Sequence, residues 1–290
     1  MSLLRNLMNK NKTAAPLLRA NYHTHTTRCG HAGADSEEDY IKTALAQGIR
    51  ILGFSDHTPW PYRTGYEDFG VRMRLSELDN YEATVRTLAR KYGSDATCGP
   101  REAAIRIYCG LECEYFPEYT DFLQELHERM DYLILGAHWT RSNEFGTAPY
   151  SGHVTQPRHL YEYAENVTAG MESGLFRNLA HPDLIFSDYP FFDSDCEEVS
   201  RRICDAALRT GTPLEFNISG RMKMRDGRFL GLGFPCLPFW EIAGESGNEV
   251  LIGCDAHGSK MLTYRQDQEF ALSFLSGSGF RFLDVLPGLE

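Results

Sequence analysis

Short apolar segments alternate with longer segments whose apolar residues recur at helical spacing, from about Ala20 to Cys254. Seven of the short segments have the length and composition of buried strands. These predicted strands are 20–24, 50–55, 104–112, 132–138, 176–181, 213–218 and 250–255. The segment 280–286 is either an eighth strand or a terminal extension, and its periodicity does not distinguish the two.

The segments between the predicted strands carry helix start and stop signals. Ser36 with Asp39, and Ser76 with Asp79, each resemble a capping box at the first turn of a helix. A glycine follows the last apolar residue of both helices, as is typical of a helix end. Further helices are predicted near 120–130, 157–172, 194–209 and 264–275.

This alternation predicts the fold class. Strands that are apolar throughout indicate a parallel sheet covered by helices on both faces. Seven such units favour a closed α/β barrel of the TIM-like type over an open doubly wound sheet. No glycine-rich linker divides the chain, so residues 20–290 are expected to form a single domain. Residues 1–19, where Arg5, Asn9 and Lys10 interrupt the apolar positions, are expected to be an N-terminal tether.

Composition narrows the classes of partner. The formal charge is −11 and no dense Lys/Arg run exists, which argues against a general nucleic-acid surface. No apolar run is long enough to cross a bilayer. The 8 cysteines are scattered at irregular intervals in a long chain, so a reduced cytoplasmic protein is expected and not a disulfide framework.

Histidines gather where the predicted strands end. His23 and His25 lie two residues apart at the end of the first strand, so both side chains face the same side and can converge on one cation. Alone, such a pair is a weak signal, because it is also found at polar strand ends. The pattern recurs, however, at or just after the other strand ends. The full set of candidate ligands is His23, His25, His31, His57, Glu112, His138, His181, Asp255 and His257.

Seven of the 10 histidines belong to this set. Because the carboxyl ends of barrel strands form one face around one axis, these residues are expected to meet in a single pocket. Imidazoles with a few carboxylates suit Zn, Fe or Mn better than Ca or Mg. Nine ligands exceed what one ion takes, so two or three divalent ions are expected. Two ions about 3.5 to 4 Å apart would deprotonate a bridging water and clamp the oxygens of a displacement at phosphorus.

The motifs HTHTTRCGHA, GFSDHTP, GLECEYF, AHPD and CDAHG resemble the successive motifs of the PHP (polymerase and histidinol phosphatase) superfamily, over residues 21–258. CGHA and SDHTP are most similar to its histidinol-phosphatase branch. The resemblance implies a distorted (β/α)7 TIM-like barrel with a trinuclear metal site. It implies a first metal held by His23, His25, Glu112 and Asp255, a second by Glu112, His138 and His181, and a third by His31, His57 and His257. Glu112, His57 and Asp255 are the residues expected to act in catalysis.

Substrate binding is predicted from arginines in loops on the same face. Arg221, in NISGRMK, resembles the phosphate-binding arginine that follows the family's sixth strand, and a guanidinium fork suits phosphate oxygens. A solvated loop charge is the alternative reading. Arg28 and Arg63 are further candidates. HPDLIFSDY departs from the family's pattern, because Phe186 and Ser187 stand where a basic residue is usual.

The leading hypothesis is therefore a phosphoric monoester hydrolase that acts through a metal-bridging hydroxide on a small phosphorylated substrate, with L-histidinol phosphate to L-histidinol and phosphate as the first reaction to test. This reaction would place the enzyme in histidine biosynthesis. Two other enzymes remain open. One is a phosphodiesterase or exonuclease of the same superfamily, and the other is an amidohydrolase-type C–N hydrolase, whose barrels also open with HxH. A metal-loaded binding module without activity is the non-catalytic alternative.

Overall fold

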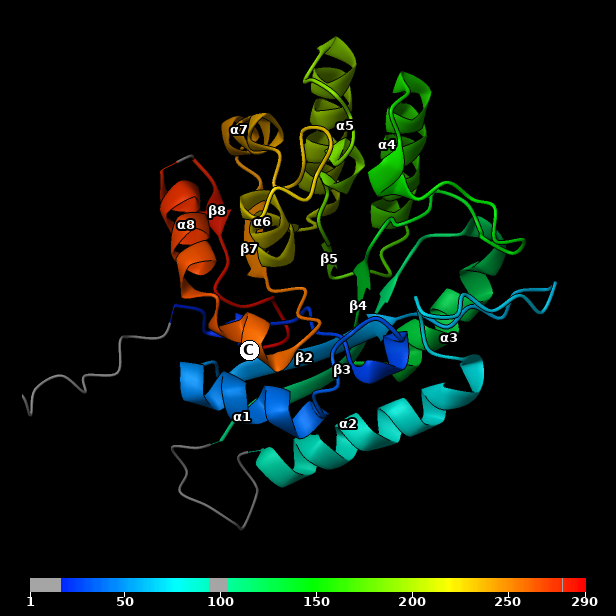
Figure 1. Ribbon diagram of the computed structural model, residues 1–290, viewed down its shortest axis with the longest axis vertical. Coiled ribbons are helices and arrows are strands. Elements are labelled where there is room, and N and C mark those ends of the chain that lie inside the picture. Colours follow the sequence, from blue (N-terminus) through cyan, green and yellow to red (C-terminus); the bar gives the residue numbers. More distant parts are fainter. Residues whose placement is uncertain (1–16, 94–103, 278) are drawn as a thin grey trace, which may run out of the picture.

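The computed structural model describes residues 17–93, 104–277 and 279–290, and it shows one parallel sheet that curls round with helices outside it (Figure 1). The strands pair in chain order, each with the strand next to it in sequence. They are β1 Ala20–Asn21, β2 Ile51–His57, β3 Arg106–Cys113, β4 Tyr132–Leu135, β5 Asn178–Leu179, β6 Leu214–Asn217, β7 Glu249–Gly253 and β8 Arg281–Phe282. The predicted TIM-like α/β class is confirmed, and the segment 280–286 contributes a short eighth strand.

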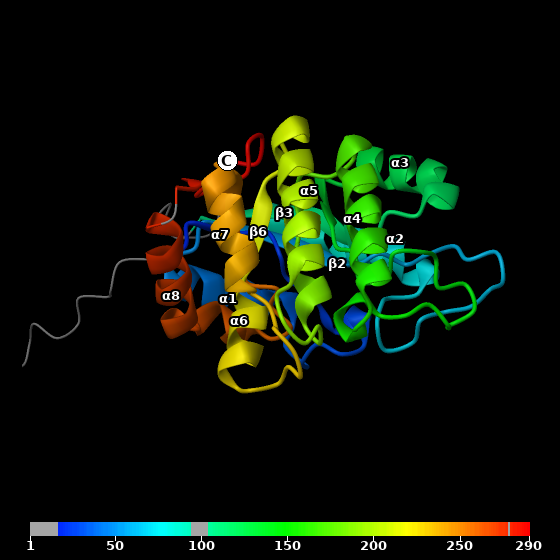
Figure 2. The same ribbon diagram turned by 90° about the horizontal axis from the view of Figure 1, so that it is seen from above.

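Helices cover the outside of the sheet. They are α1 Glu37–Gln47, α2 Leu78–Tyr92, α3 Thr120–Arg129, α4 Pro157–Glu172, α5 Ser194–Thr210, α6 Ile218–Arg225, α7 Leu237–Ser246 and α8 Arg265–Ser276. In Figure 1, α1 and α2 lie beneath the long strands β2 and β3, and Figure 2 shows α4, α5 and α7 side by side. Among the described residues, no helix combines the length and the apolar character that a bilayer crossing requires.

The ring of strands closes between β1 and β7. An isolated parallel bridge joins Thr24 to Ala256, just beyond the two strands. In it, the His25 amide donates to the Ala256 carbonyl at 2.9 Å, and the Ala256 amide donates to the His23 carbonyl at 3.2 Å. Because β8 pairs only with the amino end of β7, seven strands close the ring at the end where the candidate ligands lie.

Tyr132 lies in a buried cluster that includes Tyr22, Ile134 and Leu251. Its hydroxyl donates to the carbonyls of Tyr22 at 2.6 Å and Phe54 at 3.2 Å. The ring occupies the space beside Gly53 and Gly110 on the neighbouring strands, where any Cβ would collide with it. Glycine is therefore required at both positions.

The amino end of α1 confirms its predicted capping box. The Ser36 hydroxyl accepts from the Asp39 amide at 3.3 Å, and the Asp39 carboxylate accepts from the Ser36 amide at 2.9 Å. Two of the four free amides of the first turn are thereby satisfied.

The second predicted capping box, Ser76 with Asp79, is wrong. A 3₁₀ turn at Leu75–Glu77 precedes α2, and the Glu77 carboxylate accepts from the Arg74 amide at 2.8 Å. The chain therefore turns before Ser76 reaches a capping position, and within the described residues the Ser76 side chain makes no hydrogen bond.

Two helices were not predicted. α6 is only 8 residues long and carries Gly220, whose amide donates to the capping Asn217 side chain at 2.7 Å. α7 is apolar on most of its surface, with Phe239 and Trp240 fully buried, so it lacks the one-sided spacing that identifies a surface helix. Of the expected tether 1–19, residues 1–16 lie outside the described residues. Leu18 is buried, so the packed domain already includes it.

Candidate metal centre

The site begins with the pairing of the two longest strands. β2 and β3 run in register from Ile51 opposite Arg106 to His57 opposite Glu112. Neighbouring residues on parallel strands share a face, so the side chains of His57 and Glu112 meet at the carboxyl end of the sheet. His57 Nδ1 lies 3.0 Å from Glu112 Oε2.

Glu112 lies at the centre of the cluster, with its side chain 1% exposed. Its Oε1 is 2.8 Å from His181 Nε2 and 3.5 Å from His138 Nε2. Its Oε2 is 3.3 Å from His23 Nε2 and 3.5 Å from His25 Nε2. One carboxylate thus contacts imidazoles from separate strand ends, as expected of a group shared between cations.

Asp255 extends the cluster toward the surface. Its Oδ1 lies 3.2 Å from His25 Nε2 and 3.3 Å from His257 Nδ1. His257 Nε2 in turn lies 2.9 Å from His31 Nε2. The structure therefore brings all nine candidate ligands into one connected group.

Two of these residues have unusual backbone conformations. His181 has φ 30° and Asp255 has φ 46°, both in the left-handed region that non-glycine residues rarely adopt. Such positions cost free energy and persist where the surroundings hold them. In both cases the side chain is directed into the cluster.

The contacts between the imidazoles test whether the cluster fits cations. His23 Nε2 and His25 Nε2 are 3.1 Å apart, and His31 and His257 make a similar contact. Two ring nitrogens at this distance cannot both carry a proton toward each other. Glu112 Oε2, which lies 3.3 Å from His23 Nε2 and 3.5 Å from His25 Nε2, is buried without a hydrogen-bond partner among the described residues. Several lone pairs thus converge without protons to share, which is the arrangement that divalent metal ligands require.

Five sets of three ligand atoms lie within 4.8 Å of one another. One is His31, His57 and His257, the third set implied by the family resemblance. Others combine His23, His25 and Glu112, or His57, Glu112 and His138. These overlapping sets share Glu112, so the donors suit more than one divalent ion.

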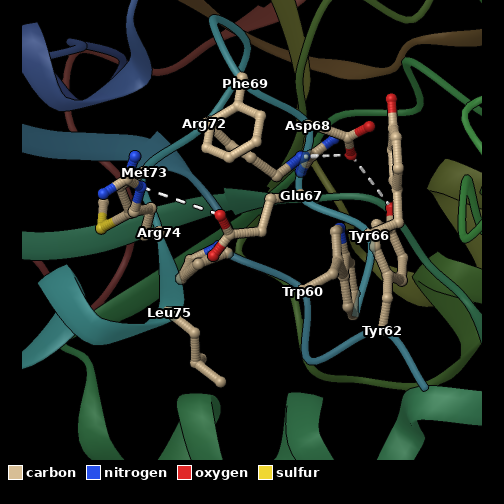
Figure 3. A pocket seen from close by; sticks show the side chains of 11 residues that line it. Trp60, Tyr62, Tyr66, Glu67, Asp68, Phe69, Arg72, Met73, Arg74 and Leu75 are labelled. Carbon is tan, nitrogen blue, oxygen red and sulfur yellow. Dashed lines mark hydrogen bonds and ion pairs between the residues drawn. The ribbon is translucent and has the colours of Figure 1, made fainter. Parts of the chain in front are cut away.

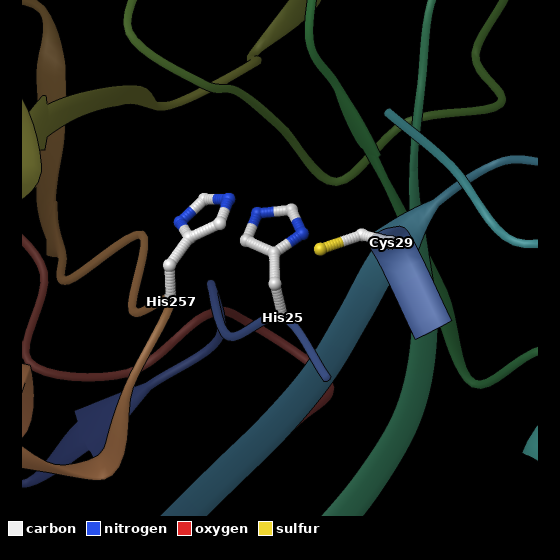
Figure 4. A group of neighbouring side chains, drawn as sticks. All are labelled: His25, Cys29 and His257. Atoms are coloured by element: carbon white, nitrogen blue, oxygen red, sulfur yellow. The ribbon is translucent and has the colours of Figure 1, made fainter. Parts of the chain in front are cut away.

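Cys29 adds a thiol that the sequence interpretation left out of the ligand set. Figure 4 shows its sulfur beside His25, with His257 on the other side. Burial raises the pKa of the Cys29 thiol to about 12, so without a cation it is protonated at neutral pH. In the sequence, the only indication that Cys29 lies at the site was the CGH motif, which places it two residues before His31.

The charges of the cluster depend on one another. Burial lowers the pKa of His57 to about 3, so this imidazole is neutral and offers a lone pair. Burial would likewise lower the pKa of His23, but the carboxylates of Glu215, Glu112 and Asp255 outweigh it and raise that pKa well above its usual range. The arrangement therefore gathers carboxylate charge in a buried place, which cations would balance.

Glu215 is a buried carboxylate that the sequence interpretation missed. Both of its oxygens lie within 3.0 Å of His23 Nδ1, and one accepts from the Asn217 side chain at 2.9 Å. A carboxylate at Nδ1 fixes the imidazole so that Nε2 faces the site. Alternation gave a signal for it, since Glu215 and Asn217 are two apart on β6 and share a face.

A cavity of about 600 Å³ opens above the cluster. His31, His57, His138 and His181 line its floor, and Trp139, Tyr150 and Phe234 contribute aromatic walls. Lys223 and Arg228 are the basic residues in the lining. The Tyr150 ring stacks on His138 with an interplanar angle of 12°.

The three predicted substrate arginines are not among the cavity residues. Arg28 is paired with Glu37 and bonded to Asn80 at 2.9 Å. The Arg63 guanidinium lies over the Tyr119 ring at 5.7 Å. The Arg221 guanidinium lies over the Phe270 ring at 4.1 Å, because Arg221 faces α8 from its position on α6. Lys223, two residues further along α6, reaches the cavity instead.

Comparison with known proteins identifies relatives over most of the chain. A sequence model of the PHP domain matches residues 21–219. The "Probable histidinol-phosphatase" of Deinococcus radiodurans is 26% identical over 240 residues, which cover 81% of this chain and 85% of that protein. Its namesake from Schizosaccharomyces pombe is 26% identical over 292 residues, or 91% of this chain and 88% of that protein.

A solved structure has the same fold. The histidinol phosphate phosphatase of Lactococcus lactis, in complex with zinc, L-histidinol and phosphate, superposes with a TM-score of 0.66 at 15% identity. The superposition covers 91% of this chain and 95% of the bacterial one. At this identity the comparison establishes the architecture.

Proposed function

The chain belongs to the PHP domain family, and from this premise we propose that it is a metal-dependent phosphomonoesterase acting on a small phosphorylated substrate, with L-histidinol phosphate as the first candidate. The observation that carries the proposal is the cavity floor, where imidazoles from separate strand ends surround Glu112 and Asp255. The names of the two relatives and the ligands of the Lactococcus lactis structure support the choice of substrate.

We assign three divalent ions to the nine ligands, since a single ion takes about four. One would be held by His31, His57 and His257. The others would share Glu112, one with His23, His25 and Asp255, and one with His138 and His181. Zn, Fe and Mn are the candidates, and the zinc of the Lactococcus lactis structure favours zinc. Bound there, these ions would supply the Lewis acidity that polarises the phosphoryl group and lowers the pKa of water.

The protein's own residues hold and orient these groups. Glu112 contributes two oxygens to different imidazole neighbours, so its removal would disturb the whole cluster. His57 and Asp255, which the sequence also assigns to catalysis, both contact His25: the His57 and His25 ring centroids lie 4.4 Å apart, and Asp255 Oδ1 lies 3.2 Å from His25 Nε2. Glu215 is bonded to His23 Nδ1 and so orients the His23 ring with Nε2 toward the site.

The cavity walls suit a phosphorylated organic molecule. Lys223 and Arg228 would pair with phosphate oxygens above the floor, a role that the sequence assigned to Arg221. Trp139, Tyr150 and Phe234 offer apolar surface to the remainder of the substrate.

The test is phosphate release by purified protein reconstituted with zinc, iron or manganese. We expect release from L-histidinol phosphate that a chelator abolishes and added metal restores. Glu112→Gln is expected to abolish turnover and to lower metal content by elemental analysis, whereas the exposed Glu118→Gln should change neither. Absence of phosphate release from this substrate and from a panel of sugar and nucleotide monophosphates would refute the proposal. Cleavage of nucleoside diesters would favour a phosphodiesterase, and a centre of one or two metals with C–N cleavage would favour an amidohydrolase.

A further inference from the structure

A buried polar network lies behind the cluster, outside the nine ligands. Its centre is Glu114, two residues after Glu112 at the end of β3, with its side chain 1% exposed. Glu114 Oε1 accepts from His138 Nδ1 at 3.2 Å and from Arg72 at 3.1 Å. Glu114 Oε2 accepts from Trp60 Nε1 at 2.9 Å and again from Arg72 at 3.2 Å. Both carboxylate oxygens are thus occupied by donors.

Arg72 holds this carboxylate in place from the loop between β2 and α2. Its side chain is 3% exposed, and its Nε donates to Asp68 at 2.9 Å. It also donates to the Thr58 carbonyl at 2.8 Å, and its guanidinium lies over the Trp139 ring at 5.2 Å. Figure 3 shows Arg72 and Asp68 facing each other beside Trp60.

Asp68 connects the network to a second loop. Its other oxygen accepts from the Asn143 side chain at 2.8 Å, and Asn143 in turn accepts from the Ala148 amide at 2.9 Å. The loop that carries Asn143 also carries Tyr150, and both Trp139 and Tyr150 line the cavity. The network therefore links two cavity walls to one imidazole of the floor.

We propose that Glu114, held by Arg72 and Asp68, is a positioning residue for His138. Accepting the Nδ1 proton of His138 leaves Nε2 without a proton, on the side where Glu112 Oε1 lies 3.5 Å away. The identity of the free nitrogen is set by the hydrogen bond at the other nitrogen. The proposal rests on the proposed function, because the free nitrogen matters only if the floor holds cations.

Stability alone does not require this arrangement. A buried ion pair exchanged for apolar residues of similar volume often leaves a fold no less stable, since desolvation of the charges offsets their attraction. In this network one carboxylate oxygen is shared between the guanidinium and a ligand imidazole. Glu114, just after β3, and Glu215, on β6, make the same kind of contact: each is bonded to the Nδ1 of a candidate ligand histidine.

The first test uses the wild-type holoprotein reconstituted with zinc. Nitrogen-15 NMR of the ring should find a proton on His138 Nδ1 that exchanges slowly with water, and no proton on Nε2. A proton on Nε2 would overturn the proposal whether or not the enzyme releases phosphate, so its failure and that of the proposed function are distinguishable.

The second test separates positioning from stability. Glu114→Gln removes one of the two carboxylates that contact Arg72, so it should lower both resistance to urea and zinc affinity. The triple variant, Glu114→Leu with Arg72→Met, made together with Asp68→Asn so that no charge of the network is left unpaired, should unfold closer to wild type than Glu114→Gln in the metal-free state. Its zinc affinity, measured by competition with a chelator, should stay roughly 10- to 100-fold below wild type.

Glu118 is an exposed carboxylate in the 3₁₀ turn Pro117–Tyr119 that follows β3, so Glu118→Gln is the matched control and should retain wild-type affinity. Wild-type zinc affinity in the triple variant would overturn the proposal, because it would show that Glu114 only pairs with Arg72 and does not position His138. If the triple variant does not fold, Glu114→Gln still decides, because wild-type zinc affinity in that variant would refute the positioning role.

Discussion

Gly253 shows how closely the residues around His23 are packed. A Cβ at this position would overlap the Glu215 carboxylate, which holds His23 Nδ1. We expect Gly253→Ala to displace Glu215 and to lower zinc affinity roughly 10- to 100-fold, as loss of an outer carboxylate does. Gly277→Ala is the matched control, since its nearest atom would be 3.7 Å away. Equal zinc affinity in both variants would show that Glu215 does not act through His23.

Lys223 is the basic residue of α6 that reaches the cavity. Removing its charge should weaken ground-state binding of a phosphorylated substrate, because a hydrogen bond to a charged group contributes about 1.5–3 kcal/mol. We expect Lys223→Met to raise KM at least about 10-fold while kcat changes less, measured by phosphate release. Lys42→Met, on the exposed face of α1, should leave both constants unchanged. A fall in kcat at constant KM would assign Lys223 to another role.

At the scale of single residues, the sequence predicted the candidate ligands but not the carboxylates that are bonded to them. The nine candidate ligands could be found because polar residues at successive strand ends are conspicuous against apolar strands. Glu114 and Glu215 were not assigned a role, because alternation shows only which face such a carboxylate shares, whereas its role depends on its partner, and the partners His138 and His23 are distant in sequence. Whether Arg221 or Lys223 faces the cavity depends on the rotation of α6, a helix the sequence did not predict.

The amino end of α1 offers a test at the scale of an element. Ser36→Ala removes the hydroxyl that accepts from the Asp39 amide and should lower the free energy of unfolding by about 1 kcal/mol. Ser76→Ala is the natural control, because Ser76 has the same sequence signature without the bond. Urea unfolding of the two variants should therefore differ, with activity unchanged in both. A loss of stability at Ser76 equal to that at Ser36 would contradict the observed start of α2.

Ser36 and Ser76 also show which features of the helices and strands could be predicted from the sequence. Alternation of strand and helix was sufficient for the order and class of the fold, because it reflects burial along the whole chain. The residue at which a helix begins depends on the turn that precedes it. A 3₁₀ turn before α2 moves the start of this helix away from the predicted residue. α7 was missed because a helix buried on most sides has no polar face to mark its period.

For the whole molecule, buried thiols contribute to the dependence of stability on alkaline pH. Burial raises the pKa of the Cys204 thiol to about 12, whereas in the unfolded chain it ionises near its ordinary value, about 8.5. Between these values the unfolded state binds fewer protons, so stability falls as pH rises, by up to about 1.4 kcal/mol per pH unit for one thiol.

Cys204→Ala should therefore flatten the decline in the free energy of unfolding between about pH 9 and 11, measured with urea under reducing conditions. Below pH 8 the thiol is neutral in both states, so the slopes of variant and wild type should coincide there. Parallel curves across the alkaline range would show that Cys204 is not kept protonated by the fold.

The bridge between Thr24 and Ala256 also has a consequence for biosynthesis. It joins the first strand of the barrel to the segment after β7, which is synthesised much later. During synthesis, His23 and His25 therefore lack Asp255 and His257 until the segment after β7 has been made. The proposed cation sites are accordingly completed only after Asp255 and His257 have been synthesised, and a nascent chain arrested before Asp255 should retain far less zinc than the released protein.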